Sequence, residues 1–399
     1  MTKLLNALLF VVYMVGHAVA GVFVNNTRVI GIPETENKRL ILLGHLAAWP
    51  VLGLALAFPP SGFLRSLARP FSYRGLWQWT FMLVGLRWIV QETYRKLHPR
   101  PQPAEVLSTA IQDADMRDHI IEFDQLKKEG ARGLVNKANQ IYAVEVITHE
   151  IKLSALPRSF DGFTILHVSD IHYAPYTSRE FLRCMVEMCR DISPDLIAIT
   201  GDFQTYPEVI ESTAELLSPL GEWSETLRGG LGVAAVLGNH DREAGAAHVT
   251  DALRRASIKV LHNSHIRIER DGSGLYVVGV ADPWSWRADL DLALHGVPEG
   301  SCTVLLAHVP DFLIAAAKRG ISLQLSGHNH GGQIKLPLLG PVLVSSRYSR
   351  RYAEGFHKQG DTLMYVSRGI GGKPPIRLGC KPEITRLVLR GSEDLRTSV

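Results

Sequence analysis

Short apolar runs alternate with amphipathic segments through the second half of the chain. Runs rich in β-branched and aliphatic residues predict buried strands, and they cover Thr164–Val168, Leu196–Thr200, Val233–Leu237, Leu275–Val280, Thr303–Ala307 and Ser322–Leu325. Segments with apolar residues at helical spacing lie between them and predict helices over Ser178–Asp191, Val209–Leu217, Gly245–Ala256 and Asp311–Lys318. This alternation predicts a layered α/β architecture.

The later part of this region is richer in strand-like runs, namely Ile266–Ile268, Val342–Val344, Leu363–Val366 and Thr385–Leu389. We therefore predict an α/β fold of two packed mixed β-sheets flanked by helices, in one domain over residues 143–399.

Near the N-terminus the apolar positions are continuous instead of periodic. Leu4–Val24 contains no Asp, Glu, Lys or Arg, and Leu40–Phe58 is a second such run. Segments of this length can span a hydrocarbon core about 30 Å thick. A third run, Leu76–Val90, is shorter and contains Arg87. We predict that residues 1–98 form a membrane region with two or three transmembrane helices.

The first run has an alternative interpretation. Ala18-Val19-Ala20 fits the cleavage pattern of a secretory signal peptide. The apolar run continues past Ala20, however, and a second run follows, which favours a retained helix.

Residues 99–142 differ in composition from both flanking regions. Pro99, Pro101 and Pro103 stiffen this segment. Ala104–Lys128 is charged and has apolar residues at helical spacing. We predict a linker with an amphipathic helix. This helix packs on a membrane or on the following domain, or it is a solvated connection between the membrane region and that domain.

Composition narrows the function classes. Hydrophobic residues make up 46% and charged residues 21% of the chain, which excludes a disordered protein. The net charge of +4, from 43 basic against 39 acidic residues, gives no reason to expect a nucleic-acid partner. The 4 cysteines form no C-x-x-C pair, so we expect neither a disulfide framework nor a thiolate zinc site.

Polar residues follow the ends of five predicted strands, as Asp170-Ile171-His172, Gly201-Asp202, Gly238-Asn239-His240-Asp241, Ala307-His308 and Gly327-His328-Asn329-His330. Open α/β sheets bind ligands at the carboxyl ends of their strands. Carboxylates, imidazoles and one amide, without a thiolate, suit Mn, Fe or Zn better than Ca or Cu(I). We expect Asp170 and His172 to face the same way on an extended tip. The glycines beside His328 and His330 would let those two side chains face different ions.

The order and spacing of these five blocks resemble the calcineurin-like metallophosphoesterase superfamily, from about Ala143 to the C-terminus. The sequences 327–333, 336–340 and 365–369 are similar to its bacterial membrane-linked branch, which includes phosphodiesterases and some UDP-2,3-diacylglucosamine pyrophosphatases. Two departures are Asn329, where the branch commonly has Thr, and the unfamiliar stretch 371–375.

The resemblance implies two divalent metal ions, Mn, Fe or Zn, joined by Asp202 and by a hydroxide that attacks phosphorus. One ion would be held by Asp170, His172, Asp202 and His330, and the other by Asp202, Asn239, His308 and His328. His240 would donate a proton to a phosphoryl oxygen or to the leaving group. Asp241 would either orient His240 or cap a helix.

A late basic cluster offers further phosphate contacts, since guanidinium groups suit phosphate recognition. It contains Arg347, Arg350, Arg351, Arg368, Lys373 and Arg377. Arg347, Arg350 and Arg368 are the predicted substrate-binding residues. The alternative is a solvated charged surface.

Together these observations predict a membrane-anchored, dinuclear metal-dependent phosphohydrolase. We expect it to cleave a phosphodiester or pyrophosphate bond, in a phosphorylated small molecule or a lipid-linked or nucleotide-diphosphate substrate. The alternatives are a broad-range phosphomonoesterase and a catalytically inactive membrane scaffold or sensor. The predicted location is a bacterial inner membrane, with the positive-inside rule slightly favouring a cytoplasmic catalytic domain.

Overall fold

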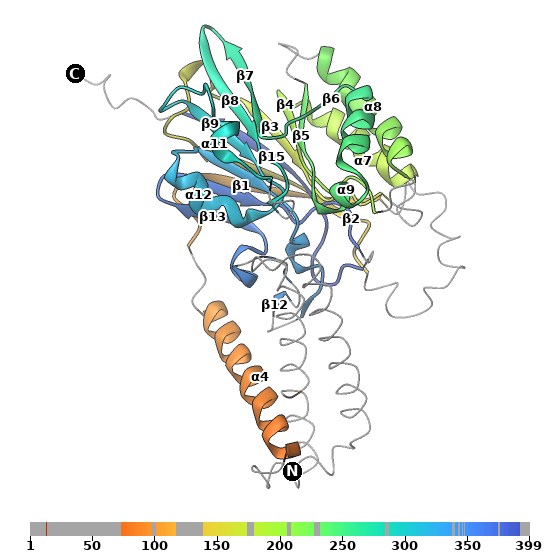
Figure 1. Ribbon diagram of the computed structural model, residues 1–399, viewed down its shortest axis with the longest axis vertical. Helices are drawn as coiled ribbons and strands as arrows, with labels where there is room; N and C mark the ends of the chain where they lie inside the picture. Colours follow the sequence, from red (N-terminus) through yellow and green to blue (C-terminus); the bar gives the residue numbers. More distant parts are fainter. Residues whose placement is uncertain are drawn as a thin grey trace, which may run out of the picture. The chain divides into compact units, whose positions relative to one another are not determined.

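Figure 1 shows a computed structural model of the protein. It describes residues 13, 73–97, 101–116, 139–173, 179–205, 209–226, 232–283, 287–336, 340–341, 344, 346, 348–373 and 376–391. The chain divides into two compact units: Met1–Pro101 with Leu336–Arg347, and Gln102–Lys335 with Tyr348–Val399. The second unit contains the two large sheets and all the predicted site residues except Arg347.

The first large sheet has seven strands in the order β1-β2-β15-β3-β4-β5-β6. They are β1 (Val106–Asp115), β2 (Ala143–Lys152), β15 (Glu383–Arg390), β3 (Thr164–Val168), β4 (Leu196–Thr200), β5 (Val233–Val236) and β6 (Ile258–Val260). Strands β3 to β6 are parallel, whereas β15 runs antiparallel to β3 and parallel to β2. The carboxyl ends of β3, β4 and β5 therefore lie at one edge of the sheet.

The second large sheet has six strands in the order β13-β14-β10-β9-β8-β7. They are β13 (Gly355–Gln359), β14 (Thr362–Val366), β10 (Leu323–Ser326), β9 (Cys302–Leu306), β8 (Ser273–Gly279) and β7 (Ser264–Arg270). Its four middle strands are parallel and the outer two antiparallel. A two-stranded sheet joins β11 (Lys335–Leu336) to β12 (Gly340–Pro341).

Helices cover the outer face of each large sheet, as Figure 1 shows. The first sheet is covered by α7 (Arg179–Ile192), α8 (Ile210–Thr226) and α10 (Ala246–Arg255), and the second by α11 (Leu290–Ala293) and α12 (Leu313–Lys318). Alternate strand residues face opposite ways: in β3, Leu166 and Val168 join the core under the helices, whereas Ile165 joins the core between the sheets. Burial on both faces explains the continuous apolar runs of these strands.

The predicted fold of two mixed sheets flanked by helices is confirmed. Strands β3 and β4 have the predicted bounds, and helices occupy all four predicted segments, the last one shared by a 3₁₀ turn (Pro310–Phe312) and α12. Most of the predicted strand Val342–Val344 lies outside the described residues.

The predicted amphipathic helix is wrong over residues 106–115. This segment forms β1, which pairs antiparallel with β2 and is largely exposed at the sheet edge. The larger compact unit starts at Gln102 and so includes β1, and the domain boundary at 143 stays a prediction. Residues 117–138 lie outside the described part of the chain.

The third apolar run lies within α4 (Tyr73–Leu97), so its helical conformation is confirmed. Arg74, Arg87, Glu92, Arg95 and Lys96 interrupt its apolar sequence. Among the described residues, no helix combines the length and apolar character needed to cross a membrane. The predicted spans Leu4–Val24 and Leu40–Phe58 lie outside the described residues, apart from Tyr13.

Candidate metal centre

The seven predicted metal ligands meet in one place, just beyond the carboxyl ends of five strands from both sheets. The ligand atoms of six of them, all except Asn239, form overlapping groups together with His240, and within each group these atoms lie within 4.8 Å of one another. These groups are Asp170 with His172 and His330, His172 with Asp202 and His240, and Asp202 with His308 and His328.

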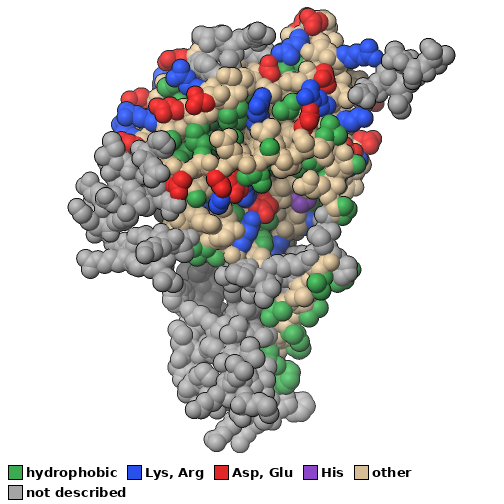
Figure 2. Space-filling view, turned by 180° about the vertical axis from the view of Figure 1, so that it is seen from behind, with side chains coloured by type: hydrophobic (Ala, Val, Ile, Leu, Met, Phe, Trp, Pro, Cys, Tyr) green, Lys and Arg blue, Asp and Glu red, His purple; other side chains and the backbone are tan. Residues whose placement is uncertain are grey.

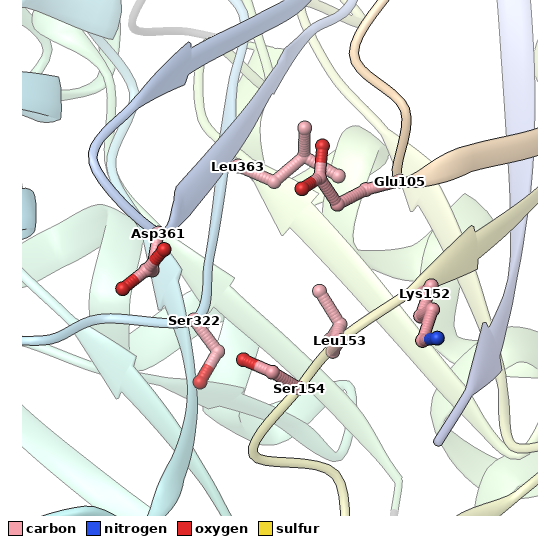
Figure 3. A pocket seen from close by; sticks show the side chains of 7 residues that line it. All are labelled: Glu105, Lys152, Leu153, Ser154, Ser322, Asp361 and Leu363. Atoms are coloured by element: carbon pink, nitrogen blue, oxygen red, sulfur yellow. The ribbon is translucent and has the colours of Figure 1, made fainter. Parts of the chain in front are cut away.

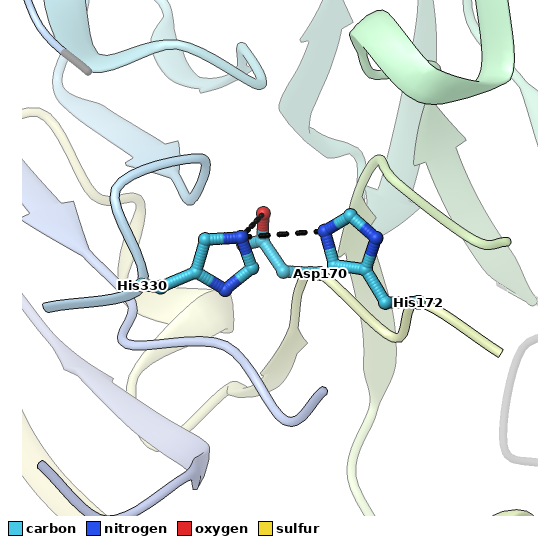
Figure 4. A group of neighbouring side chains, drawn as sticks. All are labelled: Asp170, His172 and His330. Atoms are coloured by element: carbon cyan, nitrogen blue, oxygen red, sulfur yellow. Dashed lines mark hydrogen bonds and ion pairs between the residues drawn. The ribbon is translucent and has the colours of Figure 1, made fainter. Parts of the chain in front are cut away.

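The first group, drawn in Figure 4, joins the loop after β3 to the loop after β10. The Nε2 atoms of His172 and His330 are 3.3 Å apart, and Nε2 of His330 is 3.6 Å from Oδ1 of Asp170. Both imidazoles point toward the carboxylate in Figure 4. Asp170 and His172 are buried, and the side chain of His330 is 12% exposed.

Asp202, His308 and His328 form another of these groups, which with Asn239 joins the loops after β4, β5, β9 and β10. Nε2 of His308 lies 3.3 Å from Oδ1 of Asn239 and 3.2 Å from Nδ1 of His328. Nδ1 of His308 lies 2.6 Å from the carbonyl oxygen of Thr200. An Nδ1–H donated to that carbonyl leaves the Nε2 lone pair directed at the cluster, the tautomer that a metal ligand needs.

Asp202 connects the two groups. Its Oδ2 atom lies 3.5 Å from Nε2 of His172 and 3.3 Å from Nε2 of His308. A single carboxylate oxygen thus faces one histidine of each group, which is the geometry expected of a bridging ligand.

Five of the seven predicted ligands have left-handed backbone conformations, which are Asp170, His172, Asp202, His328 and His330, with φ between 48° and 68°. The expected extended backbone is therefore wrong, although Asp170 and His172 do face the same group of ligand atoms. Positive φ is uncommon for residues other than glycine and concentrates at functional sites. The separation of His328 from His330 into different groups agrees with the prediction.

Glycines allow the ligand loops to approach each other closely. A Cβ atom on Gly238 would lie 2.2 Å from Oδ1 of Asp202. One on Gly327 would lie 2.2 Å from Oδ2 of Asp170. Neither distance is compatible with a side chain, so these positions need glycine for the ligands to keep their places.

The protonation states of the buried side chains favour the binding of a cation. Burial lowers the pKa of His172 to about 3 and, with His172 and Arg377 nearby, holds that of His330 well below its usual value. Burial would raise the pKa of Asp202, but His308 and His172 hold it well below the usual range. Both imidazoles are thus neutral and the carboxylate anionic, the states that bind metals.

His308 differs from His172 and His330, because its pKa is raised and not lowered. Burial alone would lower its pKa, but Asp202 and Asp170 raise it to about 10. The two carboxylates therefore hold a proton on His308, and a divalent cation bound here would take the place of that positive charge. Burial also raises the pKa of Asp170 to about 6.

His240 faces the same cluster from the start of α9 (Asn239–Glu243). Its ring centroid lies 5.1 Å from that of His172, and its side chain is 21% exposed. Its Nδ1 is 3.5 Å from Oε2 of Glu243. Burial opposes protonation, but Glu243 and Asp202 raise the pKa of His240 overall. A histidine with a raised pKa at the more exposed side of the cluster suits a proton donor.

The sequence predicts that Asp241 either orients His240 or caps a helix, and its contacts fit the second role. Its buried carboxylate accepts the backbone N–H groups of Gly238, Asp202 and Phe203. The bond from Gly238 is the capping contact expected at the start of a helix, and the other two fix the loop that carries Asp202. Glu243, three residues after His240, is the partner that the sequence analysis missed.

The three predicted phosphate-binding arginines have different surroundings. Arg347 lies outside the described residues, and Arg350 is partly buried on the 3₁₀ turn Ser349–Tyr352. Arg368 donates to the carboxylates of Glu383 and Glu145. Substrate binding by these residues stays a prediction, and the paired charge of Arg368 does not favour it.

A hollow on the described surface lies apart from this cluster. A hollow lined by Glu105, Lys152, Leu153, Ser154, Ser322, Asp361 and Leu363 contains none of the predicted ligands (Figure 3). It lies at the opposite ends of the strands, since Ser322 precedes β10 and Lys152 ends β2. Acidic and basic side chains are interspersed on the described surface visible in Figure 2, in keeping with the small net charge of +4.

Comparison with known proteins identifies the family. The calcineurin-like phosphoesterase profile matches residues 163–332. The uncharacterized metallophosphoesterase YkuE of Bacillus subtilis is 32% identical over 254 residues, which cover 63% of this chain and 87% of the relative. The chain belongs to the calcineurin-like phosphoesterase family. It is therefore a metal-dependent phosphoesterase, as the sequence predicted.

Two further relatives support this assignment. Phosphodiesterase YaeI of Escherichia coli is 30% identical over 61% of this chain and 88% of its own length. A zebrafish (Danio rerio) transmembrane protein with metallophosphoesterase domain is 30% identical over 74% of this chain and 67% of its own length. The predicted family is confirmed; the comparisons do not specify a branch within it.

Proposed function

We propose that this family member is a dinuclear phosphohydrolase that cleaves a phosphodiester or pyrophosphate bond. The observation that carries the proposal is the position of Asp202 Oδ2 between Nε2 of His172 and Nε2 of His308. One ion would be held by Asp170, His172, Asp202 and His330, and the other by Asp202, Asn239, His308 and His328. Carboxylate, imidazole and amide ligands fit Mn, Fe or Zn.

When bound, two such ions would acidify a water molecule and neutralise charge on the attacking and departing oxygens of the phosphoryl group. The chain itself holds the ligand atoms in place through the turns after the strands and the Thr200 contact to His308. His240, at the more exposed side of the cluster, would give a proton to the leaving group. Glu243 would orient its ring and helps to raise its pKa.

The substrate and location are further parts of the proposal. The name of the Escherichia coli relative, a phosphodiesterase, favours a diester over a monoester. A membrane anchor is supported by the apolar runs Leu4–Val24 and Leu40–Phe58 and by the name of the zebrafish relative. An anchor would give the site access to a lipid-linked phosphoester or pyrophosphate. The location we propose is a bacterial inner membrane, and the positive-inside rule slightly favours a cytoplasmic catalytic unit.

Turnover of bis-p-nitrophenyl phosphate by the purified full-length chain, loaded with Mn, Fe or Zn in turn, tests the chemistry. We expect two equivalents of metal by elemental analysis, activity that a chelator removes, and slower turnover of p-nitrophenyl phosphate. Asp202→Asn should lose activity and at least one equivalent of metal. Asp361→Asn, in the hollow of Figure 3, is the matched control and should lose neither.

A faster monoester rate would indicate the alternative phosphomonoesterase. Two bound equivalents without turnover of any phosphoester would indicate an inactive scaffold. One equivalent in an active enzyme would contradict the dinuclear proposal. Release of the protein from bacterial membranes by high salt alone would contradict the anchor.

A further inference from the structure

A buried arginine lies next to the first group of candidate ligands. Arg377 is fully buried and is the largest such side chain in the described part of the protein. Its Nε donates to the carbonyl of Gly371 over 2.9 Å, and its Nη2 donates to those of Arg368 over 2.7 Å and Gly369 over 3.1 Å. The sequence analysis placed Arg377 in a basic cluster for phosphate, but the structure directs its guanidinium at backbone carbonyls inside the protein.

The segment that accepts these bonds, residues 368–371, is in direct contact with the ligand loop after β3. The N–H of Gly371 donates to the carbonyl of Asp170 over 2.8 Å. A Cβ atom on Gly371 would lie 2.0 Å from the carbonyl oxygen of Ile171, and one on Gly369 would lie 2.7 Å from Cβ of Asp170. Because no side chain fits between the two backbones, a shift of this segment would move Asp170 with it.

Arg377 also contacts the loop that carries His330. Its Nη1 lies 3.5 Å from the carbonyl oxygen of His330, and its Nη2 lies 3.5 Å from Nδ1 of the same residue. The other ring nitrogen, Nε2, is directed at the cluster and lies 3.6 Å from Oδ1 of Asp170, as Figure 4 shows. One guanidinium therefore contacts the loop of His330 and also holds the segment that packs on the loop of Asp170.

The backbone of Arg377 is held separately from the metal-ligand loops. Its N–H donates to Oδ1 of Asn139 over 2.9 Å, and its carbonyl accepts the N–H of Gln140 over 2.8 Å. Both partners shortly precede β2. Charge-assisted bonds from the planar guanidinium to several carbonyls then leave the side chain little freedom to move. The first sheet thus provides a fixed point from which Arg377 reaches two ligand loops.

We infer that Arg377 is a positioning residue for the first of the two proposed ions, the one that the group in Figure 4 would hold. Its guanidinium keeps the loops after β3 and β10 at the spacing that this ion needs. Among the described residues, its hydrogen bonds do not reach the loops after β4, β5 and β9, which carry the ligands of the second ion other than His328. The inference rests on the proposed function, because it requires two separate ions.

Calorimetry of the purified full-length protein with Mn²⁺ tests this role without turnover, in two backgrounds that each keep one complete ligand set. His308→Gln keeps the set of the first ion, and His330→Gln keeps that of the second. Arg377→Lys keeps the charge but loses the planar fork of donors. It should weaken Mn²⁺ binding about 10- to 100-fold in the His308→Gln background and less than about threefold in the other, as loss of a group that orients ligands does.

The comparison of backgrounds separates positioning from a general loss of structure. Equal weakening by Arg377→Lys in both backgrounds would overturn the inference, as would unchanged Mn²⁺ affinity in both. Arg255→Lys is the matched control, since Arg255 is exposed on α10 and pairs with Glu211 at 2.7 Å, and it should change neither affinity. Absence of wild-type turnover, with Mn²⁺ binding that depends on Arg377 in the His308→Gln background alone, would instead contradict only the proposed function.

A second variant decides the question if Arg377→Lys does not fold. Asn139→Ala removes the acceptor that fixes the backbone N–H of Arg377 and leaves the guanidinium itself unchanged. It should weaken Mn²⁺ binding in the His308→Gln background by a smaller factor than the range given for Arg377→Lys, and leave binding in the His330→Gln background unchanged. The same Mn²⁺ affinity with and without Asn139→Ala in the His308→Gln background would overturn the inference.

Discussion

Substitution of His240 can distinguish a role in proton transfer from a role in metal binding. If it acts as the proton donor, His240→Gln should lower kcat by about 10²- to 10⁴-fold while two equivalents of metal remain bound. The measurement is turnover together with elemental analysis of the same sample. His248→Gln, an exposed histidine of α10 paired with Glu211, is the control and should keep full activity. Because His240 shares a ligand-distance group with His172 and Asp202, loss of metal from His240→Gln would make it a ligand instead.

Gly238 shows how closely the site is packed. In Gly238→Ala the new methyl carbon would lie 2.2 Å from Oδ1 and 2.7 Å from the backbone nitrogen of Asp202, so the central ligand must move. We expect at least tenfold weaker metal binding in calorimetry and a loss of about 1–3 kcal/mol in unfolding free energy, as overpacking causes. Gly391→Ala, where the nearest contact would be an ordinary 3.6 Å, should change neither.

At the scale of elements, β15 carries a buried ion pair close to the ligand loops. Glu383 is 2% exposed and accepts from Arg368, from the backbone N–H of Arg368 at 3.1 Å and from the hydroxyl of Tyr365 at 2.8 Å. Burial would raise the pKa of Glu383, yet the charge of Arg368 lowers it overall.

Removing one charge from such a pair typically costs about 3–5 kcal/mol, so Glu383→Gln should reduce the free energy of unfolding in urea by that order. The control is Glu215→Gln. Glu215 pairs with Arg179 at 3.3 Å, but their side chains are 69% and 45% exposed, so we expect a loss below about 1 kcal/mol. Equal losses in the two variants would show that burial does not strengthen the Arg368–Glu383 pair.

The elements that sequence patterns predicted well are those buried on both faces. β3 and β4 are continuous apolar runs, and their bounds follow from composition alone. β1 could not be predicted in this way, because most of its residues are exposed and, among the described strands, it pairs with β2 alone. Its spaced apolar residues fitted a helix, and pairing with a distant segment decided the outcome.

In the candidate metal centre too, some features follow from the local sequence and others depend on contacts between distant segments. Its ligands are polar residues that directly follow buried strands, so their convergence could be predicted from order and spacing. The positive φ values of Asp170 and His172, the contact of Glu243 with His240 and the burial of Arg377 depend on the packing of loops, for which the sequence carries no periodic signal.

For the whole molecule, buried histidines predict a loss of stability in acid. Burial lowers the pKa of both His149 and His167 to about 4, whereas an unfolded histidine titrates near 6.5. Between these values the unfolded chain binds protons that the folded chain does not. The free energy of unfolding should therefore fall as pH drops from about 6.5 to 4, by about 3 kcal/mol for each histidine.

Urea unfolding at pH 7 and pH 4.5 measures this effect. His149→Gln should lose less stability than the wild type between the two values, whereas His295→Gln, which removes an exposed histidine, should lose as much as the wild type. An unchanged pH dependence in His149→Gln would show that His149 is not responsible for proton uptake on unfolding.

The position of β15 also affects how the protein is made. This strand, the last one that the structure describes, lies between β2 and β3 and is hydrogen-bonded to both. During synthesis on the ribosome, the two halves of that sheet therefore remain unjoined until residues 383–390 have emerged. A premature stop codon before Glu383 would remove the bridge between these halves rather than trim an end, so it would leave a chain that cannot complete its main sheet.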